Sequence, residues 1–147
     1  DRLYLVVPCY NEEEVLPETV RRLTDKLRRM EEKGLVSGDS RILLVDDGSR
    51  DSTWELICGF HRENPVVSGL KLSRNRGHQN ALVAGLLTAR ELCDITISLD
   101  ADLQDDIENG IPSSLQATLA ILMLANDAFL WNSSFLRSVD WQSLRPA

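Results

Sequence analysis

Four short apolar runs constrain what this 147-residue chain can fold into more than any other feature. The runs cover residues 3–7, 42–45, 66–72 and 95–99, and the third is less regular because it contains Gly69. Continuous apolar runs of this length that are rich in β-branched residues indicate strands buried on both faces. Helical patterns separate the runs, so the sequence predicts right-handed βαβ crossovers and a mostly parallel α/β sheet flanked by helices.

The segment between the first two runs carries apolar residues at helical spacing. Pro17 suits the first turn of a helix. The buried face of that helix is predicted to consist of Leu16, Val20, Leu23, Leu27 and Met30. Its other face carries a run of charged side chains, which is typical of a solvated helix surface.

Two further helices follow. Ser52 and Glu55 are spaced as a capping box, which predicts that the second helix begins near Thr53. Its buried face would comprise Trp54, Ile57 and Phe60. The third helix is predicted over residues 79–92, and the residues at helical spacing are Leu82, Gly85, Leu86, Ala89 and Leu92.

Charge and cysteine content limit the kinds of partner and compartment. The formal net charge of -7 argues against nucleic-acid binding, which favours basic surfaces. It does not exclude an anionic ligand, because a metal ion and local basic residues can offset it. Cys9, Cys58 and Cys93 lie far apart and predict buried free thiols in a reducing compartment. No apolar run approaches the ~20 residues that a membrane-spanning helix needs.

Three of the predicted strands are followed at once by polar clusters, at residues 8–12, 46–49 and 100–104. The carboxyl ends of parallel strands share one edge of a sheet, and ligands of open α/β sheets bind at that edge. The three clusters are therefore expected to converge into one site. A single acidic pair after a strand would be weak evidence, but three clusters in the same position are stronger.

The residue types in these clusters suit a nucleotide diphosphate compound and a metal ion. Tyr10 can stack on a base or sugar face, and Asp47 can accept a hydrogen bond from a nucleobase N–H or a ribose hydroxyl. Asp102, with Asp100 and Gln104, can supply oxygen ligands to Mg²⁺ or Mn²⁺. The structural alternatives are a packed tyrosine and an acidic turn that caps a helix.

A basic stretch follows the third run, and it consists of Lys71, Arg74, Arg76 and His78. These side chains either face a diphosphate or form an ordinary charged surface. The residue pattern leaves both possibilities open.

Two phosphotransfer classes are alternatives at this point. An enzyme of the haloacid-dehalogenase type would use Asp100 as its nucleophile, but such enzymes usually carry Thr or Val where this chain has Gln104. A receiver domain would use an acidic pair such as Asp46 and Asp47, but this chain lacks a later strand that ends in the expected lysine. A covalent aspartyl phosphate at Asp100 would favour the first class.

Four segments of the chain resemble motifs of family 2 glycosyltransferases, which have the GT-A fold. The segments are residues 7–13, 45–53, 73–81 and 99–105, in the order that the family shows. The form Asp-Ala-Asp-Leu-Gln-Asp in the last segment is closest to the branch that glycosylates polyprenyl phosphates, such as the dolichol-phosphate mannosyltransferases. The resemblance implies a Rossmann-like nucleotide-binding half.

The resemblance also implies roles for the matched positions. The nucleotide-sugar-binding residues would be Pro8, Tyr10, Asn11, Glu12, Asp47, Asp100 and Asp102. The ligands of a Mg²⁺ or Mn²⁺ ion would be Asp100, Asp102 and Gln104. Family members of this type invert the anomeric centre by direct attack of the acceptor. A phosphate acceptor is already an anion, so it needs little help from a general base, and no catalytic base is predicted.

The implied activity is transfer of a sugar from a UDP- or GDP-linked donor to an acceptor, in this branch a polyprenyl phosphate. The implied location is the cytoplasm or the cytoplasmic face of a membrane, with membrane contact through a longer parent protein. The resemblance covers residues 3–108, and residues 106–108 lack the proline that this branch usually has there.

Residues 1–109 are therefore expected to form the donor-binding half, and residues 110–147 a divergent tail. Leu115, Leu119, Leu122 and Leu130 have spacing that is compatible with a helix in that tail. The alternative function is an inactive, truncated module that binds a nucleotide or a protein partner.

Overall fold

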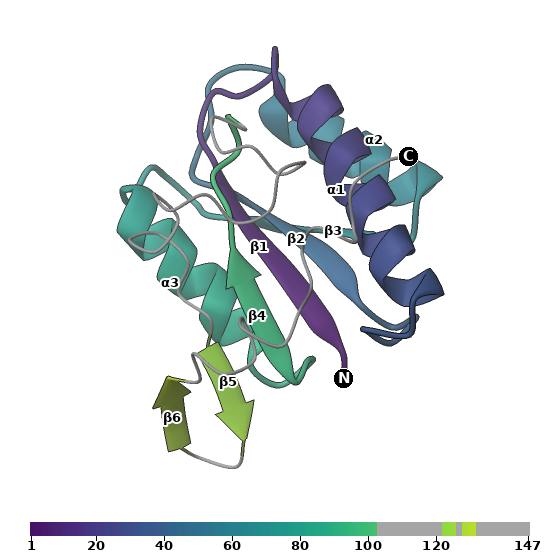
Figure 1. The fold of residues 1–147 in the computed structure, drawn as a ribbon. Helices are drawn as coiled ribbons and strands as arrows, with labels where there is room; N and C mark the ends of the chain where they lie inside the picture. The colour runs from purple at the N-terminus through teal and green to yellow at the C-terminus, as the bar shows by residue number, and fades with distance from the viewer. Residues whose placement is uncertain (103–121, 126–127, 132–147) are drawn as a thin grey trace.

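A parallel sheet forms the centre of the molecule. The structure, a computed structural model, describes residues 1–102, 122–125 and 128–131. The strands β1 (Leu3–Cys9), β2 (Arg41–Asp46), β3 (Val67–Lys71) and β4 (Ile95–Ser98) pair in parallel in the order β3-β2-β1-β4 (Figure 1). The predicted strands and the mostly parallel α/β sheet are confirmed.

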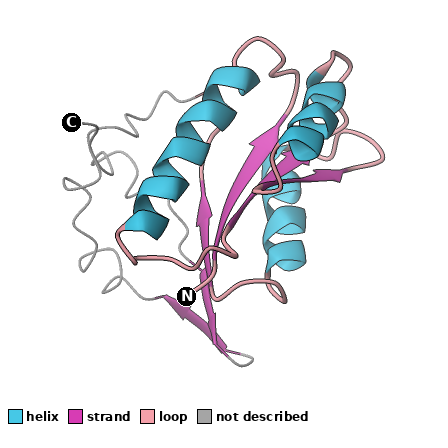
Figure 2. Ribbon diagram, turned by 90° about the vertical axis from the view of Figure 1, so that its right-hand side faces the viewer, coloured by secondary structure: helices cyan, strands magenta, loops and turns pink. Residues whose placement is uncertain are grey.

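Helices lie on both sides of the sheet (Figure 2). The helices α1 (Leu16–Glu32) and α2 (Thr53–Glu63) share one apolar cluster with Leu5 and Val7 of β1. The helix α3 (His78–Ala89) packs on the other face, where Val6 belongs to a second cluster. Because both faces are covered, β1 and β4 are buried along nearly their whole length, whereas β3 is buried only at Val67.

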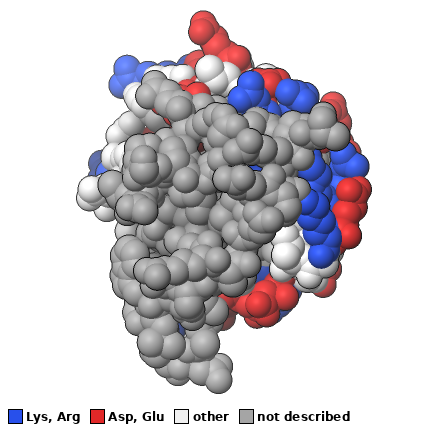
Figure 3. Space-filling view, in the orientation of Figure 1, with Lys and Arg blue, Asp and Glu red and all other residues white. Residues whose placement is uncertain are grey.

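The predicted buried face of α1 is confirmed. Its members are Leu16, Val20, Leu23, Leu27 and Met30, and all are buried. On the outer face, Glu18 pairs with Arg21 at 2.6 Å and with Arg22 at 2.8 Å. The exposed members of the charged run form a solvated band of mixed sign, visible at the right of Figure 3. The prediction is wrong at Lys26, which belongs to the same run and is buried.

The predicted capping box of α2 is wrong in its residues. The helix begins at Thr53, and Ser52 is its N-cap residue. The Ser52 side chain makes no capping hydrogen bond to the first turn of the helix. Asp51 accepts from the Thr53 N–H instead, at 3.0 Å. The Ser52 N–H, which a capping box would pair with Glu55, donates instead to Glu13 Oε2 in the neighbouring loop. Ile57 is buried as predicted, whereas Trp54 and Phe60 are only partly buried.

The third helix is shorter than predicted. It ends at Ala89, and the predicted inward residue Leu92 is 46% exposed. The Leu92 N–H bonds to the Ala89 carbonyl in a tighter turn, so the helical spacing is lost there. The buried residues of α3 are Ala81, Gly85 and Ala89, and their small size lets the helix approach the sheet, since a Cβ on Gly85 would lie 2.5 Å from Val6 Cγ1.

Two antiparallel strands extend the sheet beyond β4. The strand β5 (Leu122–Ala125) pairs with β4, and β6 (Ala128–Trp131) pairs with β5. The predicted helix is therefore wrong at Leu122 and Leu130, since periodicity alone does not distinguish short apolar strands from helices. Leu115 and Leu119 lie outside the described residues, as does the predicted boundary at residue 109.

The three cysteines are free thiols, as predicted, with Cys9 and Cys93 buried and Cys58 half-buried. Within the residues that the structure describes, no helix has the length and apolar character required to cross a membrane.

Candidate functional site

The predicted polar clusters meet at one edge of the sheet. β1 and β2 end side by side, because Cys9 lies opposite Asp46. β4 runs beside β1 with Ser98 opposite Val6, so the chain after β4 emerges at the same edge. The predicted convergence is confirmed for the clusters at 8–12 and 46–49 and for the described part of the third.

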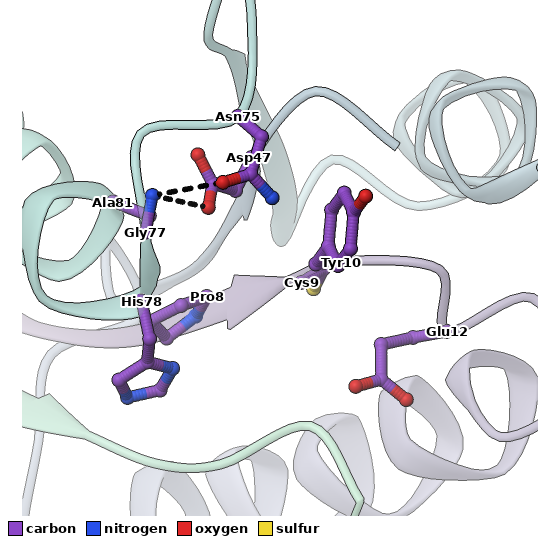
Figure 4. Close-up of a pocket in the computed structure, with 9 residues that line it drawn as sticks. All are labelled: Pro8, Cys9, Tyr10, Glu12, Asp47, Asn75, Gly77, His78 and Ala81. Carbon is purple, nitrogen blue, oxygen red and sulfur yellow. Dashed lines mark hydrogen bonds between the residues drawn. The ribbon is translucent and has the colours of Figure 1, made fainter. Parts of the chain in front are cut away.

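A cavity of about 160 Å³ opens at this edge (Figure 4). Four of its lining residues belong to the predicted set, namely Pro8, Tyr10, Glu12 and Asp47. The other lining residues are Cys9, Asn75, Gly77, His78 and Ala81. The Tyr10 ring stands beside the cavity and is 40% exposed, so one of its faces is available for stacking.

Asn11 fastens the loop after β1 to the loop after β2. Its N–H donates to Ser49 Oγ at 3.0 Å, and its Oδ1 accepts from the Arg50 N–H at 2.9 Å. Asn11 has a φ of 53°, a left-handed conformation that asparagine tolerates better than most residues. It also lines a neighbouring cavity of about 150 Å³. Asn11 therefore has a structural task in addition to its predicted binding role.

A second pair of bonds fastens the same two loops. The Glu13 N–H donates to Asp51 Oδ2 at 3.2 Å, and the Ser52 N–H donates to Glu13 Oε2 at 2.9 Å. The Glu12 N–H donates to Thr53 Oγ1 at 2.9 Å. The resulting network holds the residues around the cavity in one arrangement before any ligand arrives.

Asp46 and Asp47 are both buried, which is unusual for carboxylates unless they are hydrogen-bonded. Asp46 Oδ1 accepts from the Ser49 N–H at 3.3 Å, while Asp46 Oδ2 has no partner among the described residues. Asp47 Oδ1 accepts from the Arg76 N–H at 2.7 Å, and Asp47 Oδ2 accepts from the Gly77 N–H at 3.0 Å (Figure 4). Asp47 thus binds the loop that forms one wall of the cavity.

The acidic pair follows β4. Asp100 is half-buried and Asp102 is exposed, so both carboxylates are accessible from solvent. Between them, the buried Ala101 carbonyl accepts a 2.6 Å hydrogen bond from the Thr19 hydroxyl of α1. A helix of the rigid core thereby fixes the turn that carries the two carboxylates. The predicted third metal ligand, Gln104, lies outside the described residues.

Glu12 completes a negatively charged surface near this pair. Burial raises the pKa of the Glu12 carboxyl, and the negative charge of Asp102 raises it further. Asp51 and Asp100 act in the same direction. Negative charges gathered around Glu12 in this way favour a cation at this edge of the sheet.

Some residues of the basic stretch lie at the cavity, where a diphosphate could bind, and others belong to the ordinary charged surface. His78 lines the cavity, and its Nε2 lies 3.5 Å from Asp100 Oδ1. Lys71 lies over the Trp54 ring, 5.4 Å from its centroid, as part of the packing of α2. Arg74 and Arg76 are exposed on the loop that bounds the cavity.

The residues present fit a hard divalent cation as part of a site. Asp100 and Asp102 supply oxygen atoms, which Mg²⁺ and Mn²⁺ prefer. In the part of the chain that the structure describes, no group of three or more His, Cys, Asp or Glu side chains is arranged to hold a metal. Of the predicted ligands, the acidic pair lies among the described residues, and a Mg²⁺ ion held by two carboxylates would take further ligands from substrate phosphates.

Sequence reasoning missed the backbone N–H groups that the loop at 72–77 donates to Asp47. Gly77 contributes a backbone N–H and has a φ of 91°, which favours glycine. Asn75 accepts from the same Gly77 N–H at 3.1 Å. The available sign in the sequence was Gly77, a glycine just before a predicted helix. The side-chain pattern does not show which backbone N–H groups act as donors.

Comparison with known proteins identifies the family. Residues 4–116 match the family described as "Glycosyl transferase family 2". The chain is 54% identical over 105 residues to an uncharacterized glycosyltransferase, YkoT, of Bacillus subtilis. The alignment covers 71% of this chain and 31% of the relative. It is 39% identical over 105 residues to an undecaprenyl-phosphate 4-deoxy-4-formamido-L-arabinose transferase of Pseudomonas fluorescens. That alignment covers 71% of this chain and 29% of the relative.

Two solved structures show the same fold. Residues 1–349 of S. aureus TarS superpose with a TM-score of 0.55 at 20% identity, covering 69% of this chain and 28% of that one. The mannosyltransferase PcManGT of Pyrobaculum calidifontis, solved with GDP-Man and Mn²⁺, gives 0.52 at 21% identity, covering 69% and 27%. At these identities the structures are informative about the fold alone. The match also spans less than a third of the curated relatives' length.

The chain belongs to glycosyl transferase family 2. The family that the sequence motifs indicated is confirmed. Membership of this family rules out the dehalogenase-type and receiver alternatives.

Proposed function

We propose that this member of glycosyl transferase family 2 carries the donor-binding half of a metal-dependent glycosyltransferase. The donor would be a nucleotide-diphosphate sugar with UDP or GDP. The observation that supports the proposal most is the cavity at the carboxyl edge of the sheet, which Tyr10, Asp47 and Glu12 line beside the acidic pair.

Each part of the donor would meet a chemically suitable group. Tyr10 would stack on the base or a sugar ring, and Pro8 would pack beside it. Asp100 and Asp102 would hold Mg²⁺ or Mn²⁺, with Gln104 as a third ligand. When bound, the cation would neutralise the charge that develops on the leaving diphosphate. His78 lies where it can donate a hydrogen bond to the same phosphates.

The proposed acceptor is a polyprenyl phosphate. The support is the 39% identity to a relative named as an undecaprenyl-phosphate transferase and the form of the acidic segment after β4. An acceptor phosphate is already ionised at neutral pH, so the proposal requires no general base from this chain. Because the acceptor is a lipid, the longer protein would work at a membrane surface.

Calorimetric titration of UDP-glucose and GDP-mannose tests the donor site. Each titration is done with Mn²⁺ and with EDTA, on the 147-residue chain and on Asp102→Ala. We expect binding that requires metal and that Asp102→Ala abolishes. Asp39→Ala is the matched control, because it removes an exposed carboxylate before β2, at the opposite edge of the sheet. A folded chain that binds neither compound would refute the donor site.

The second candidate is a truncated module that binds the nucleotide without transfer. It is favoured by the match to less than a third of the curated relatives' length. Radiolabelled sugar transfer to undecaprenyl phosphate separates the two. Product formation supports the glycosyltransferase, whereas metal-dependent binding without product supports the module.

A further inference from the structure

We propose that Thr19 of α1 is a positioning residue for the acidic pair, because its hydroxyl holds the turn between Asp100 and Asp102 in place before a divalent cation binds. The hydrogen bond belongs to the folded chain and is independent of the proposed function. Its consequence for Mg²⁺ or Mn²⁺ rests on that function.

Thr19 places a polar group in an apolar part of α1. The residue is fully buried, and its neighbours Leu16 and Val20 are buried too. Burial of a hydroxyl is unfavourable unless it has a hydrogen-bond partner. The Thr19 hydroxyl lies 2.6 Å from the Ala101 carbonyl and 3.1 Å from the Val15 carbonyl of its own helix. A hydroxyl has one proton to donate, so the shorter contact with the acidic turn is the stronger one.

Ala101 is anchored through both its side chain and its carbonyl. Its side chain belongs to the same apolar cluster as Leu16 of α1, and its carbonyl accepts the Thr19 bond. The residues on either side differ from it, since Asp100 is half-buried and Asp102 is exposed. The turn is therefore held by its middle residue, and the two flanking carboxylates remain accessible from solvent.

The anchor acts where the sheet no longer holds the chain. The register of β4 with β1 ends at Ser98, opposite Val6. One further backbone bond, from the Leu99 N–H to the Val6 carbonyl at 3.0 Å, leads into the turn. The Thr19 bond follows at Ala101 and joins positions that are 82 apart in the sequence. It connects the acidic turn to a core helix.

A cation at this site would depend on such support. Besides burial, the charges of Asp102 and Asp100 raise the pKa of Glu12, so three carboxyl groups gather at this edge of the sheet. Their mutual repulsion drives them apart unless the backbone that carries them is fixed. The Thr19 bond occupies a backbone carbonyl and no carboxylate oxygen, so it fixes the turn without competing with a metal ion.

Three substitutions on α1 separate the hydroxyl from the rest of the side chain. Thr19→Val replaces the hydroxyl by a methyl group and removes the hydrogen bond from the buried Ala101 carbonyl. Thr19→Ser keeps the donor and is the conservative variant. Thr24→Val is the matched control, because the Thr24 hydroxyl of the same helix is buried and has no hydrogen-bond partner among the described residues.

Backbone relaxation measured by NMR on the metal-free chain tests the anchor alone. We expect order parameters of about 0.85 for the Ala101 and Asp102 amides in the wild type, Thr19→Ser and Thr24→Val, and of less than about 0.6 in Thr19→Val. Values of less than about 0.6 in the wild type would overturn the proposal without any variant. A turn that stays rigid in Thr19→Val would also overturn it.

Titration of Mn²⁺ in the presence of UDP tests the consequence for the cation, with the free ion followed by electron paramagnetic resonance. We expect Thr19→Val to weaken Mn²⁺ binding about tenfold, since groups that orient metal ligands contribute strongly to metal affinity. Thr19→Ser should restore the affinity, and Thr24→Val should leave it unchanged. Equal Mn²⁺ affinities of Thr19→Val and the wild type would overturn the proposal. Equal losses in Thr19→Val and Thr24→Val would do the same, because they would indicate a general effect of α1 packing.

The two measurements separate this proposal from the proposed function. A wild-type chain that binds no Mn²⁺ counts against the proposed function, and the order parameters still decide whether Thr19 fixes the turn. If Thr19→Val does not fold, as judged by circular dichroism, Thr19→Cys replaces it, because a thiol is a weak donor. The order parameters and the Mn²⁺ affinity of Thr19→Cys should then be lower than those of Thr19→Ser, and equal values would overturn the proposal.

Discussion

Gly48→Ala is the substitution whose effect follows most directly from the structure. Gly48 has a φ of +69°, and an added Cβ would lie 2.5 Å from the Asn75 nitrogen and 2.6 Å from the Arg74 carbonyl carbon. Both neighbours are backbone atoms, so rotation of a side chain does not relieve the overlap. The loop at 72–77 must move, or the alanine must leave its conformation.

The expected loss has two parts. A left-handed conformation costs a non-glycine residue about 1–2 kcal/mol. Overpacking against atoms that do not yield costs about 1–3 kcal/mol. The sum is a fall of about 2–5 kcal/mol in the free energy of unfolding, which is a large part of the total for a domain of this size.

Gly34→Ala is the matched control. Gly34 has a φ of +70°, but no atom lies within 4 Å of the position that its Cβ would take. The control therefore carries the conformational loss without the overlap, and the change in unfolded-chain entropy cancels between the two variants.

Urea unfolding followed by circular dichroism measures the difference. With a slope of ~2 kcal/mol/M, a typical value for small proteins, Gly48→Ala should unfold at about 0.5–1.5 M less urea than Gly34→Ala. Equal midpoints would refute the reasoning, because the close approach of the two loops would then have no energetic weight.

Three other predictions concern the core and the acidic turn. Thr19→Val removes the hydroxyl that holds the Ala101 carbonyl, so Mn²⁺-dependent donor affinity should fall about tenfold by calorimetry, and Thr19→Ser should restore it. Gly85→Ala places a Cβ 2.5 Å from Val6 Cγ1 and should lower the free energy of unfolding by about 1–3 kcal/mol; Val6→Ala should recover part of this loss in the double variant, measured by urea unfolding. Burial raises the pKa of the Cys93 thiol from 9.0 to about 11, so the unfolded chain releases this proton at a lower pH than the native chain. The thiol's stabilising contribution is therefore present below pH 9 and lost as the pH rises towards about 11, and Cys93→Ala should flatten that part of the pH profile of urea unfolding.

β3, which contains Ser68 and Gly69, carried a weaker pattern, whereas β1, β2 and β4 were predictable because each contains a buried apolar run. Such a run has few alternatives in a soluble chain, and parallel connectivity then brings the ends of β1, β2 and β4 together. The positions of Tyr10 and Asp47 at those ends were predictable for the same reason.

Interactions through the backbone were not predictable. Asp51 accepts from the Thr53 N–H at the start of α2, and Glu13 takes the Ser52 N–H that the predicted capping box would have paired with Glu55. That choice depends on a loop 39 residues away in the sequence. Gly77 likewise donates its N–H to Asp47, and the identity of a residue does not indicate which way its backbone N–H points.

The path of the chain through the sheet has a consequence for how the protein is made. β1 is paired with β2 on one side and with β4 on the other, so Leu3 finds its partner Ile95 only after every other strand of the parallel sheet has been synthesised. Loop closure over such a distance is slow compared with the formation of local contacts. During translation, β3, β2 and β1 would therefore be complete while one edge of β1 still had unpaired backbone N–H and C=O groups. Pairing with β4 would be the step that satisfies them. The acidic pair follows directly after that strand, so the chain acquires these two candidate metal ligands when the parallel part of its sheet is completed.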